Sequence, residues 1–474
     1  MAGPQPQQDS SGRALIAVTV LASFVAFLDG SVVNLALPAI SADLGGGLTL
    51  QQWVVDAYLL TLGALILVAG AISDALGRLT VLRAGLVIFA VASLLCALAP
   101  TGALLVAARC IQGVGAAFLV PSSLAMINER FSGAEQSRAV GTWTAWTGTA
   151  FVVGPLFGGV LVDTLDWRWI FAINLPPLLV TLYLTTRLPS PAARPAGRGL
   201  RGVDVVGAAL TALGLTGVVV ALIEQQRLGT WHPLVVGAFV GGAAALVVFP
   251  FWERRTAAPM MPLEIFASRN FSVANAATVF LYAGVSLGLL AVTLFLMEGV
   301  GLSATQAGLA TLPIPVLSFF LAGRFGALAG RHGARWYMAA GPLLAAAGFL
   351  LIAGIRVEFD FWTQLLPGLV LFGVGLSMTV SPLTATVLAA VDPARSGISS
   401  AVNNAVSRVA GLLAIANLGV IVGGTMDVAG FRRAAVITAA LFAAAGVISA
   451  VGIVNKRVAA VASVDAARCL DRGR

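Results

Sequence analysis

Charged residues inside long apolar stretches are where this chain has most scope for chemistry. Asp29 lies in the segment LDGSVVNLALP, within the mainly apolar run 14–40. If that run crosses a membrane, a carboxylate in its middle costs several kcal/mol unless it is paired, hydrated or protonated. A carboxyl group held under such conditions can take up and release a proton. Asp29 is therefore a candidate proton-coupling residue.

A second charge, Arg109, is placed where it can meet Asp29. Arg109 stands about seven residues into its own apolar run, and Asp29 about nine residues before Pro38. At about 1.5 Å per residue, both lie roughly 10–13 Å below the same surface. Burial would favour protonated Asp29, whereas a nearby guanidinium would favour the carboxylate. Because arginine stays charged, Arg109 can tune a proton site but cannot carry the proton. The alternative is a structural ion pair between two helices.

Two more charges lie inside apolar runs. Asp56 is about five residues into its run, roughly 7 Å deep, and is the third candidate for proton coupling. It belongs either to an outer vestibule that attracts cations or to a hydrated interface. Arg408 is about ten residues into its run, beside Asn403 and Asn404. A charge at that depth must face protein or water, and we expect packing or gating there rather than direct substrate contact.

Other polar and aromatic side chains in the apolar runs are candidates for lining a substrate cavity. Each polar group could equally bond between helices, and each aromatic ring could equally face lipid. Together with the charged Arg408, the candidates are Asn34, Gln112, Trp143, Trp146, Phe280, Asn403 and Asn404.

The composition indicates a membrane protein with many spans. Hydrophobic residues make up 59% of the 474 residues and charged residues 10%, against about 25% charged in soluble domains. The net charge of +8 is spread over many short loops, so it does not indicate nucleic-acid binding. The three cysteines predict neither a disulfide framework nor a metal site. The polar N-terminus does not read as a signal peptide.

The apolar runs predict fourteen transmembrane helices. They are placed at about 14–38, 51–72, 79–99, 102–126, 139–162, 168–187, 203–223, 233–252, 271–297, 305–323, 335–354, 363–389, 398–421 and 433–455. An even number puts both termini on one side. If that side is cytoplasmic, 21 of the 28 Lys and Arg residues fall in cytoplasmic segments and five in outer ones, as the positive-inside rule favours.

A repeated spacing predicts duplicated halves. Gly70, Asp74 and Gly77 have the same 0, +4, +7 spacing as Gly326, Gly330 and Gly333. Both segments follow an apolar run, as in transporters built from repeats. The predicted parts are a disordered cytoplasmic tail (1–13), a six-helix half (14–187), a cytoplasmic linker (188–202), two inserted helices (203–252), a cytoplasmic loop (253–270), a second six-helix half (271–455) and a cytoplasmic tail (456–474).

Six segments, in this order, resemble the fourteen-helix drug:proton antiporter family of the major facilitator superfamily. They are LDGSVVNLALP (28–38), GAISDALGR (70–78), RCIQGVGAA (109–117), GTAFVVGPLFGG (148–159), WRWIFAINLP (167–176) and SGISSAVNNAVSRVAG (396–411). The chain departs from the family at Gly330, where an acidic residue is more usual, and at Glu298, where a neutral polar residue is. Both departures leave the substrate preference open.

The resemblance assigns roles to two of these segments. It implies that Gly70, Asp74, Gly77 and Arg78 form a cytoplasmic latch between the halves, which stabilises an outward-open state. From the residues alone, the segment could equally be a turn with a surface salt bridge worth about 0–1 kcal/mol. The second segment is the antiporter helix motif, which serves as a hinge, a proton-tight seam or simply a tightly packed face. Its residues are Gly148, Gly154, Pro155, Gly158 and Gly159.

The resemblance implies a proton-driven secondary transporter that exports small amphipathic or cationic compounds, such as drugs or antibiotics, by alternating access. The alternatives are a dedicated exporter of one metabolite or self-made antibiotic, and a non-transporting membrane sensor. The sequence contains no P-loop and no His inside a predicted span, so it does not indicate ATP-driven transport or an enzyme. We expect a monomer in the plasma membrane that uses the proton gradient and no cofactor. Its partners would be a small-molecule substrate and membrane lipid.

Overall fold

The computed structural model describes residues 6–188, 204–257, 259–392 and 395–455. Within these ranges the chain forms helices joined by short connections, with no strand. Fourteen of the described helical stretches are long and apolar enough to cross a membrane. Their number and places match the predicted spans, which confirms the all-α integral membrane fold.

The helices of the first part of the chain are α1 (Pro6–Leu44), α2 (Gly47–Leu76), α3 (Arg78–Ala97), α4 (Gly102–Arg130), α5 (Gly133–Gly148), α6 (Ala150–Thr164), α7 (Trp169–Ala172), α8 (Leu175–Thr186), α9 (Val205–Leu228) and α10 (Pro233–Glu253). Those of the second part are η2 (Leu263–Ala267), α11 (Arg269–Leu294), η3 (Phe295–Gly299), α12 (Ala304–Thr311), α13 (Pro313–His332), α14 (Ala334–Ala353), η4 (Phe361–Leu365), α15 (Leu366–Ala389), α16 (Ser396–Ala416), α17 (Leu418–Val422) and α18 (Val428–Gly452).

The observed helices differ from the predicted spans mainly at their ends. α1 begins at Pro6, so part of the segment 1–13 that we predicted as a disordered tail is helical. α13 continues to His332, well beyond the predicted end at 323, because its sequence contains no strong helix breaker before Gly333. Nearly all of the predicted linker and the predicted tail 456–474 lie outside the described residues.

The two repeated segments end in the same kind of turn. Gly77 joins α2 to α3 with φ 96° and ψ 130°, and Gly333 joins α13 to α14 with φ 90° and ψ 148°. Residues with a side chain rarely adopt such angles, whereas glycine does so readily. The two copies therefore share a backbone conformation as well as a spacing.

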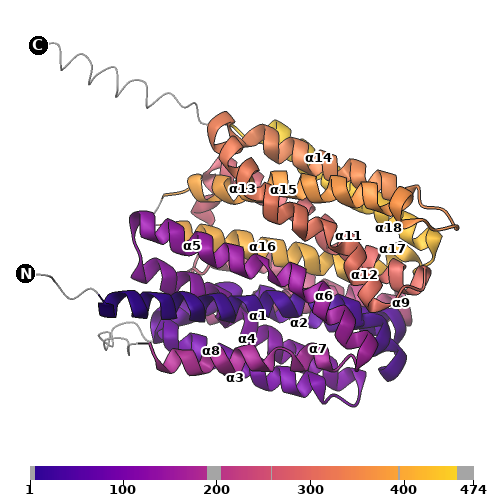
Figure 1. Ribbon diagram of the computed structural model, residues 1–474, viewed down its shortest axis with the longest axis horizontal. Coiled ribbons are helices and arrows are strands. Elements are labelled where there is room, and N and C mark those ends of the chain that lie inside the picture. The colour runs from indigo at the N-terminus through magenta and orange to yellow at the C-terminus, as the bar shows by residue number, and fades with distance from the viewer. Residues whose placement is uncertain (1–5, 189–203, 258, 393–394, 456–474) are drawn as a thin grey trace, which may run out of the picture.

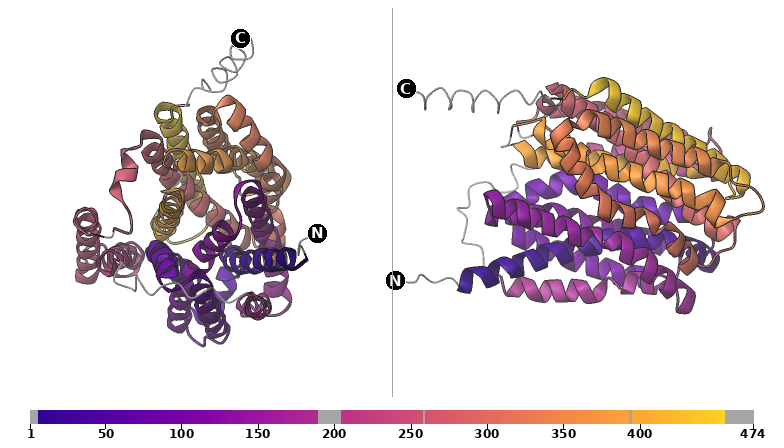
Figure 2. Two further views of the ribbon diagram at one scale, coloured as in Figure 1. Left: turned by 90° about the vertical axis from the view of Figure 1, so that its left-hand side faces the viewer. Right: turned by 45° about the horizontal axis from the view of Figure 1, so that its top comes forward.

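The helices form two bundles that lie face to face. We call α1 to α8 the first bundle and α11 to α18 the second, and Figure 1 shows most of the first below the second. The bundles meet chiefly where α2 packs along α16 and where α6 packs against α12. α9 and α10 pack on each other, with α9 also against α2 and α16, and Figure 2 shows this pair at the edge of the molecule.

Two ends of the molecule need names. α1 begins and α18 ends at the same end, on the left of Figure 1, which we call the terminal side. The opposite end, where α1 ends, α12 begins and α17 lies, is the far side.

Candidate functional site

Asp29 lies in the core of the first bundle with a hydrogen-bond donor for each of its oxygens. Its side chain is 0% exposed, and that of Arg109 is 1% exposed. Nη1 of Arg109 donates to Oδ2 at 2.5 Å. Nε2 of Gln112 and Nδ2 of Asn174 donate to Oδ1 at 2.8 and 2.9 Å. An ionised Asp29 is therefore neutralised by a cation and held by two further amide donors.

Arg109 is bonded on its other side as well. Nε of Arg109 donates to the carbonyl of Val54 at 2.9 Å, and Nη1 also donates to Oε1 of Gln112 at 2.6 Å. The guanidinium carbon lies 4.4 Å from the centre of the Tyr58 ring, within range of a cation–π interaction. The network thus ties α1, α2 and α4 to the start of α8. Sequence reasoning placed Asp29 and Arg109 at similar depth, and the structure brings them into contact.

Asn174 is a member of this network that the sequence analysis did not single out. It is 0% exposed and stands in the segment WRWIFAINLP, just before α8. An amide followed by Leu-Pro-Pro reads in sequence as an ordinary helix start. The signal present in the sequence was that Asn174 is a polar residue near the end of WRWIFAINLP, one of the six segments that resemble the antiporter family.

Asp56 is equally buried, but its surroundings differ. Its side chain is 0% exposed, and within the described part of the chain no group donates a hydrogen bond to either carboxyl oxygen. It is therefore not the hydrated interfacial charge that the sequence left open. An isolated carboxylate in an apolar interior is much more costly than a neutral carboxylic acid. This position accommodates the protonated form.

The neighbours of Asp56 along α2 show which face it occupies. Four residues before it, Gln52 donates to the carbonyls of Ile415 and Ala416 on α16, at 2.8 and 3.0 Å. Seven residues after it, Gly63 lies so close to α16 that an added Cβ would be 3.6 Å from Cβ of Arg408. Positions four and seven apart share one face of a helix. Asp56 therefore lies on the seam where α2 of the first bundle meets α16 of the second.

Arg408 and Asn404 line a small cavity between the bundles. Its remaining walls come from α1, α2 and α4, and none of its lining residues is acidic: Ala26, Phe27, Tyr58, Leu62, Ile66, Ala116 and Val120. The free volume is about 10 Å³, enough for roughly one water molecule. A larger ligand can enter only when the bundles move apart.

The other predicted cavity residues have different surroundings. Trp143 is buried in the first bundle, where its Nε1 donates to Oγ of Ser23 at 3.1 Å. Asn403 donates to Asn275 and Thr278 on α11, within the second bundle. Trp146 is 60% exposed. Asn34 is partly buried on α1, and Phe280 is partly buried against the main apolar core.

Glycines of the antiporter helix motif lie close to both α1 and α12. A Cβ atom on Gly154 or Gly158 would collide with the side chains of Ser31 or Val32 on α1. A Cβ atom on Gly159 would lie 2.6 Å from Cα of Thr305 on α12. One on Gly308 of α12 would collide with the carbonyl oxygen of Pro155. At these glycines the backbone of α6 therefore lies directly against α12 of the second bundle. Gly148, at the end of α5, has nothing within 4 Å of an added Cβ.

Polar contacts also join the bundles on the far side. Both carboxyl oxygens of Asp163, at the end of α6, accept backbone hydrogen bonds from Ala304 and Thr305, at 3.0 and 2.8 Å. These amides are the free donors at the start of α12, so Asp163 caps that helix from the other bundle. Nε2 of Gln51 donates to Glu298 at 2.6 Å across the same boundary. The sequence analysis did not identify Asp163, because a lone acid at a helix end is common.

Other glycines of α5 and α13 have free space beside them. On α5, Gly141 and Gly148 have nothing within 4 Å of an added Cβ atom, and the same holds for Gly323 and Gly330 on α13. The close glycine contacts between α6 and α12 have no counterpart at these four positions. The bundles are therefore packed closely against each other on the far side, and these four positions show no such close packing.

The predicted latch segment lies on the terminal side. Nη1 of Arg78 donates to the carbonyl of Ala125 and lies 3.2 Å from Oε2 of Glu129, and both of these acceptors belong to α4 of the same bundle. Gly70 has open space beside it. The side chain of Asp74 lies outside what the structure describes. A latch between the bundles remains a prediction.

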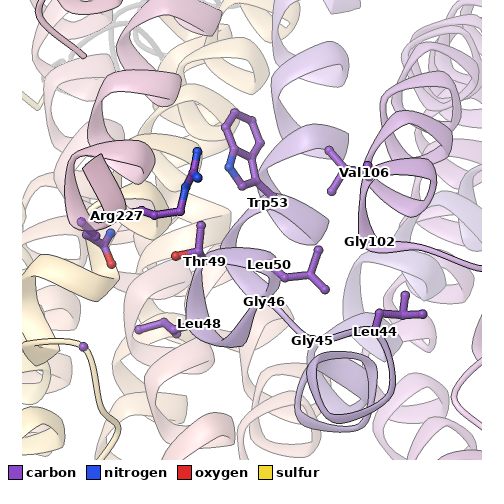
Figure 3. Close-up of a pocket in the computed structure, with 13 residues that line it drawn as sticks. Leu44, Gly45, Gly46, Leu48, Thr49, Leu50, Trp53, Gly102, Val106 and Arg227 are labelled. Carbon is purple, nitrogen blue, oxygen red and sulfur yellow. The ribbon is translucent and has the colours of Figure 1, made fainter. Parts of the chain in front are cut away.

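A larger groove lies elsewhere, on the far side (Figure 3). It has a volume of about 810 Å³ and is lined by the α1–α2 connection, the start of α4 and the end of α9, with Leu50, Trp53 and Arg227 among its residues. None of the residues predicted for the site lines this groove. Gly424 of the second bundle lines it together with residues of the first bundle and of α9.

Comparisons with known proteins are consistent with this architecture. A family model described as Major Facilitator Superfamily matches residues 19–415. The Puromycin resistance protein pur8 of Streptomyces alboniger is 38% identical, over 86% of this chain and 81% of its own length. The Multidrug resistance protein Stp of Mycobacterium tuberculosis is 33% identical, over 85% and 74%. The crystal structure of a D-xylose-proton symporter has a TM-score of 0.67 at 14% identity, over 94% of this chain and 98% of that chain. This last likeness concerns the fold alone.

Proposed function

Because this chain belongs to the Major Facilitator Superfamily, we propose that it is a proton-driven exporter of small amphipathic compounds that works by alternating access. The names of two relatives refer to puromycin resistance and to multidrug resistance, which supports substrates of that kind. We place the protein in the plasma membrane as a monomer, with both termini in the cytoplasm according to the positive-inside rule. The proton gradient supplies the energy, and no cofactor takes part.

The asymmetry between the two sides supports alternating access. The contacts that seal the far side join one bundle to the other, so they can separate without unfolding either bundle. With cytoplasmic termini, closure on the far side corresponds to a molecule that faces inward. Separation of the bundles on the terminal side would then let the cavity receive substrate from the cytoplasm. Rocking of the bundles about the buried contact between α2 and α16 would expose the same cavity to the outside.

One observation supports proton coupling at Asp56. Both of its carboxyl oxygens are buried between the bundles, and no described group donates a hydrogen bond to them. While the site is closed, the neutral acid is the form it accommodates. When the bundles separate and water reaches the seam, hydration lowers the free energy of the ionised carboxylate, and the proton can leave. Asp56 thus couples its protonation to the conformation of the bundles.

Asp29 has a different role in this proposal. Its carboxylate already has a cation and two amide donors, all from the first bundle. Because these contacts do not cross the boundary between the bundles, rocking leaves them in place. Asp29 and Arg109 therefore hold the first bundle together, and the proton moves at Asp56.

The test measures proton movement in everted membrane vesicles with an acidic interior. A panel of acidic, neutral and cationic antibiotics is added, and substrate-dependent loss of the proton gradient is followed for wild type, Asp56→Asn and Asp29→Asn. The matched control is Glu264→Gln, an exposed acid at the protein surface. We expect wild type and the control to release protons, and Asp56→Asn to release none.

A second readout separates lost coupling from lost protein. Substrate exchange without a proton gradient should survive in Asp56→Asn, because exchange needs no proton step. Proton release that persists in Asp56→Asn but vanishes in a stably folded Asp29→Asn would move the coupling to Asp29. No gradient-dependent transport of any compound by wild type would refute the proposed function.

A further inference from the structure

Arg408 is a partly buried cation within a membrane-spanning helix, and no carboxylate in the described structure balances its charge. It lies on α16, twelve residues after the helix begins at Ser396, with its Cβ opposite Gly63 of α2. No described acidic residue lies within salt-bridge distance of it, and its buried Nε has no hydrogen-bond acceptor among the described residues. Its guanidinium carbon lies 5.8 Å from the centre of the Phe27 ring. A charge inside a membrane protein normally faces a partner or water.

No other described residue that lines the cavity carries a negative charge to balance Arg408. Its walls are otherwise aliphatic or aromatic, apart from the amide of Asn404 and the hydroxyl of Tyr58. That hydroxyl donates to the carbonyl of Ala26. In the first bundle, Asp29 and Arg109 neutralise each other at 2.5 Å. The cavity therefore combines apolar walls with one positive charge that is not cancelled.

We infer that the substrates of this transporter carry an acidic group that is ionised at neutral pH, a carboxylate or a phenolate, on an apolar and partly aromatic body. This inference rests on the proposed transport function and names its substrate class. A guanidinium presents its donors in a planar fork that matches a carboxylate. The ring of Phe27 and the aliphatic walls suit the apolar body. A lipophilic cation would instead meet a like charge in a site of low dielectric constant.

The anion site and the proton site are distinct. Asp56 and Gly63 are seven residues apart on α2, so Asp56 lies roughly 10 Å along the helix from the level of Arg408. A substrate bound at Arg408 therefore does not occupy the place of the proton. The coupling between them runs through the rocking of the bundles rather than through competition for one group. Export of an anion is also favoured by a membrane potential that is negative inside.

Binding of three matched probes to the purified, full-length protein in detergent tests this inference. The probes are pyrenebutyrate, its uncharged amide and pyrenebutylamine, which share a body and differ in charge. Pyrenebutyrate should bind at least about tenfold more tightly than either analogue, because it forms a charge-assisted hydrogen bond. In Arg408→Gln this preference should disappear, and in Arg408→Lys part of it should remain.

Arg395→Gln is the matched control, since it removes the same charge from the start of the same helix, where Arg395 pairs with exposed Glu264. It should retain the wild-type preference. Elution as a single species in size-exclusion chromatography checks that each variant is folded. Equal binding of the three probes, tighter binding of the amine, no binding of the acid, or an unchanged preference in folded Arg408→Gln would each overturn the inference. Gradient-driven transport of cations but not acids would refute the substrate class while leaving the proposed function intact.

Discussion

Replacing Asp29 by Asn tests whether the buried network of the first bundle is structural. The substitution keeps the shape of the side chain and removes its charge. One oxygen can still accept from Gln112 or Asn174, but the new amide nitrogen faces the guanidinium of Arg109, donor against donor. Arg109, which is 1% exposed, would then be a buried cation without a counter-charge.

The expected cost follows from the contacts that are lost. Removing one partner of a buried ion pair destabilises a protein by about 3–5 kcal/mol, mostly because the remaining charge stays desolvated. Arg109→Gln should cost a similar amount for the same reason. The double variant removes both charges together, so it should cost less than the sum of the two single variants. We expect a coupling energy of about 2–3 kcal/mol, near the upper end of the range for groups in contact.

Unfolding of the purified protein by SDS in mixed micelles, followed by tryptophan fluorescence, measures these differences. Asp43→Asn is the matched control, because Asp43 is on the same helix but is 47% exposed and pairs with Arg168. A surface pair of this kind contributes about 0–1 kcal/mol. If Asp29→Asn is as stable as Asp43→Asn, or if the effects of Asp29→Asn and Arg109→Gln simply add, the network is not a structural element.

Three further predictions concern contacts of α5, α6 and α12. Gly308→Ala should prevent closure of the far side, because its Cβ meets the Pro155 carbonyl; labelling of a cysteine introduced at Ala307 from the far side should then increase. Asp163→Asn should weaken the cap of α12 by about 1 kcal/mol and increase the same labelling less strongly, whereas unchanged labelling would refute a sealing role. Trp143→Phe should lower unfolding stability by about 1 kcal/mol through loss of its hydrogen bond, without changing the preference among the pyrene probes.

The spans could be predicted because the bilayer imposes a local rule. A helix that crosses about 30 Å of hydrocarbon needs about 20 apolar residues, and this requirement is visible in any window of the chain. The ends of the helices were less predictable, because a helix does not stop at the membrane surface. α13 runs on to His332 until Gly333 turns the chain, although its last turn carries the basic residues Arg331 and His332.

The depth of a charge was also predictable, since it depends only on counting residues along a helix. This reasoning brought Asp29 to the level of Arg109, where the structure finds them in contact. It could not supply Asn174, which is 145 residues from Asp29 in the chain and reaches it only through packing of α8 against α1. Nor could it show that Asp163 caps a helix of the other bundle.

By itself, the sequence determined the class of protein, the number of membrane spans and the depth of each buried charge. Local hydropathy and the rise of a helix suffice for these. Only the tertiary structure decided how the charges differ, because every compensating group comes from another helix. Asp29 and Asp56 look alike in sequence, each an acid in an apolar run. Packing surrounds Asp29 with three donors, leaves Asp56 with none among the described residues, and turns Arg408 toward a cavity without an acid.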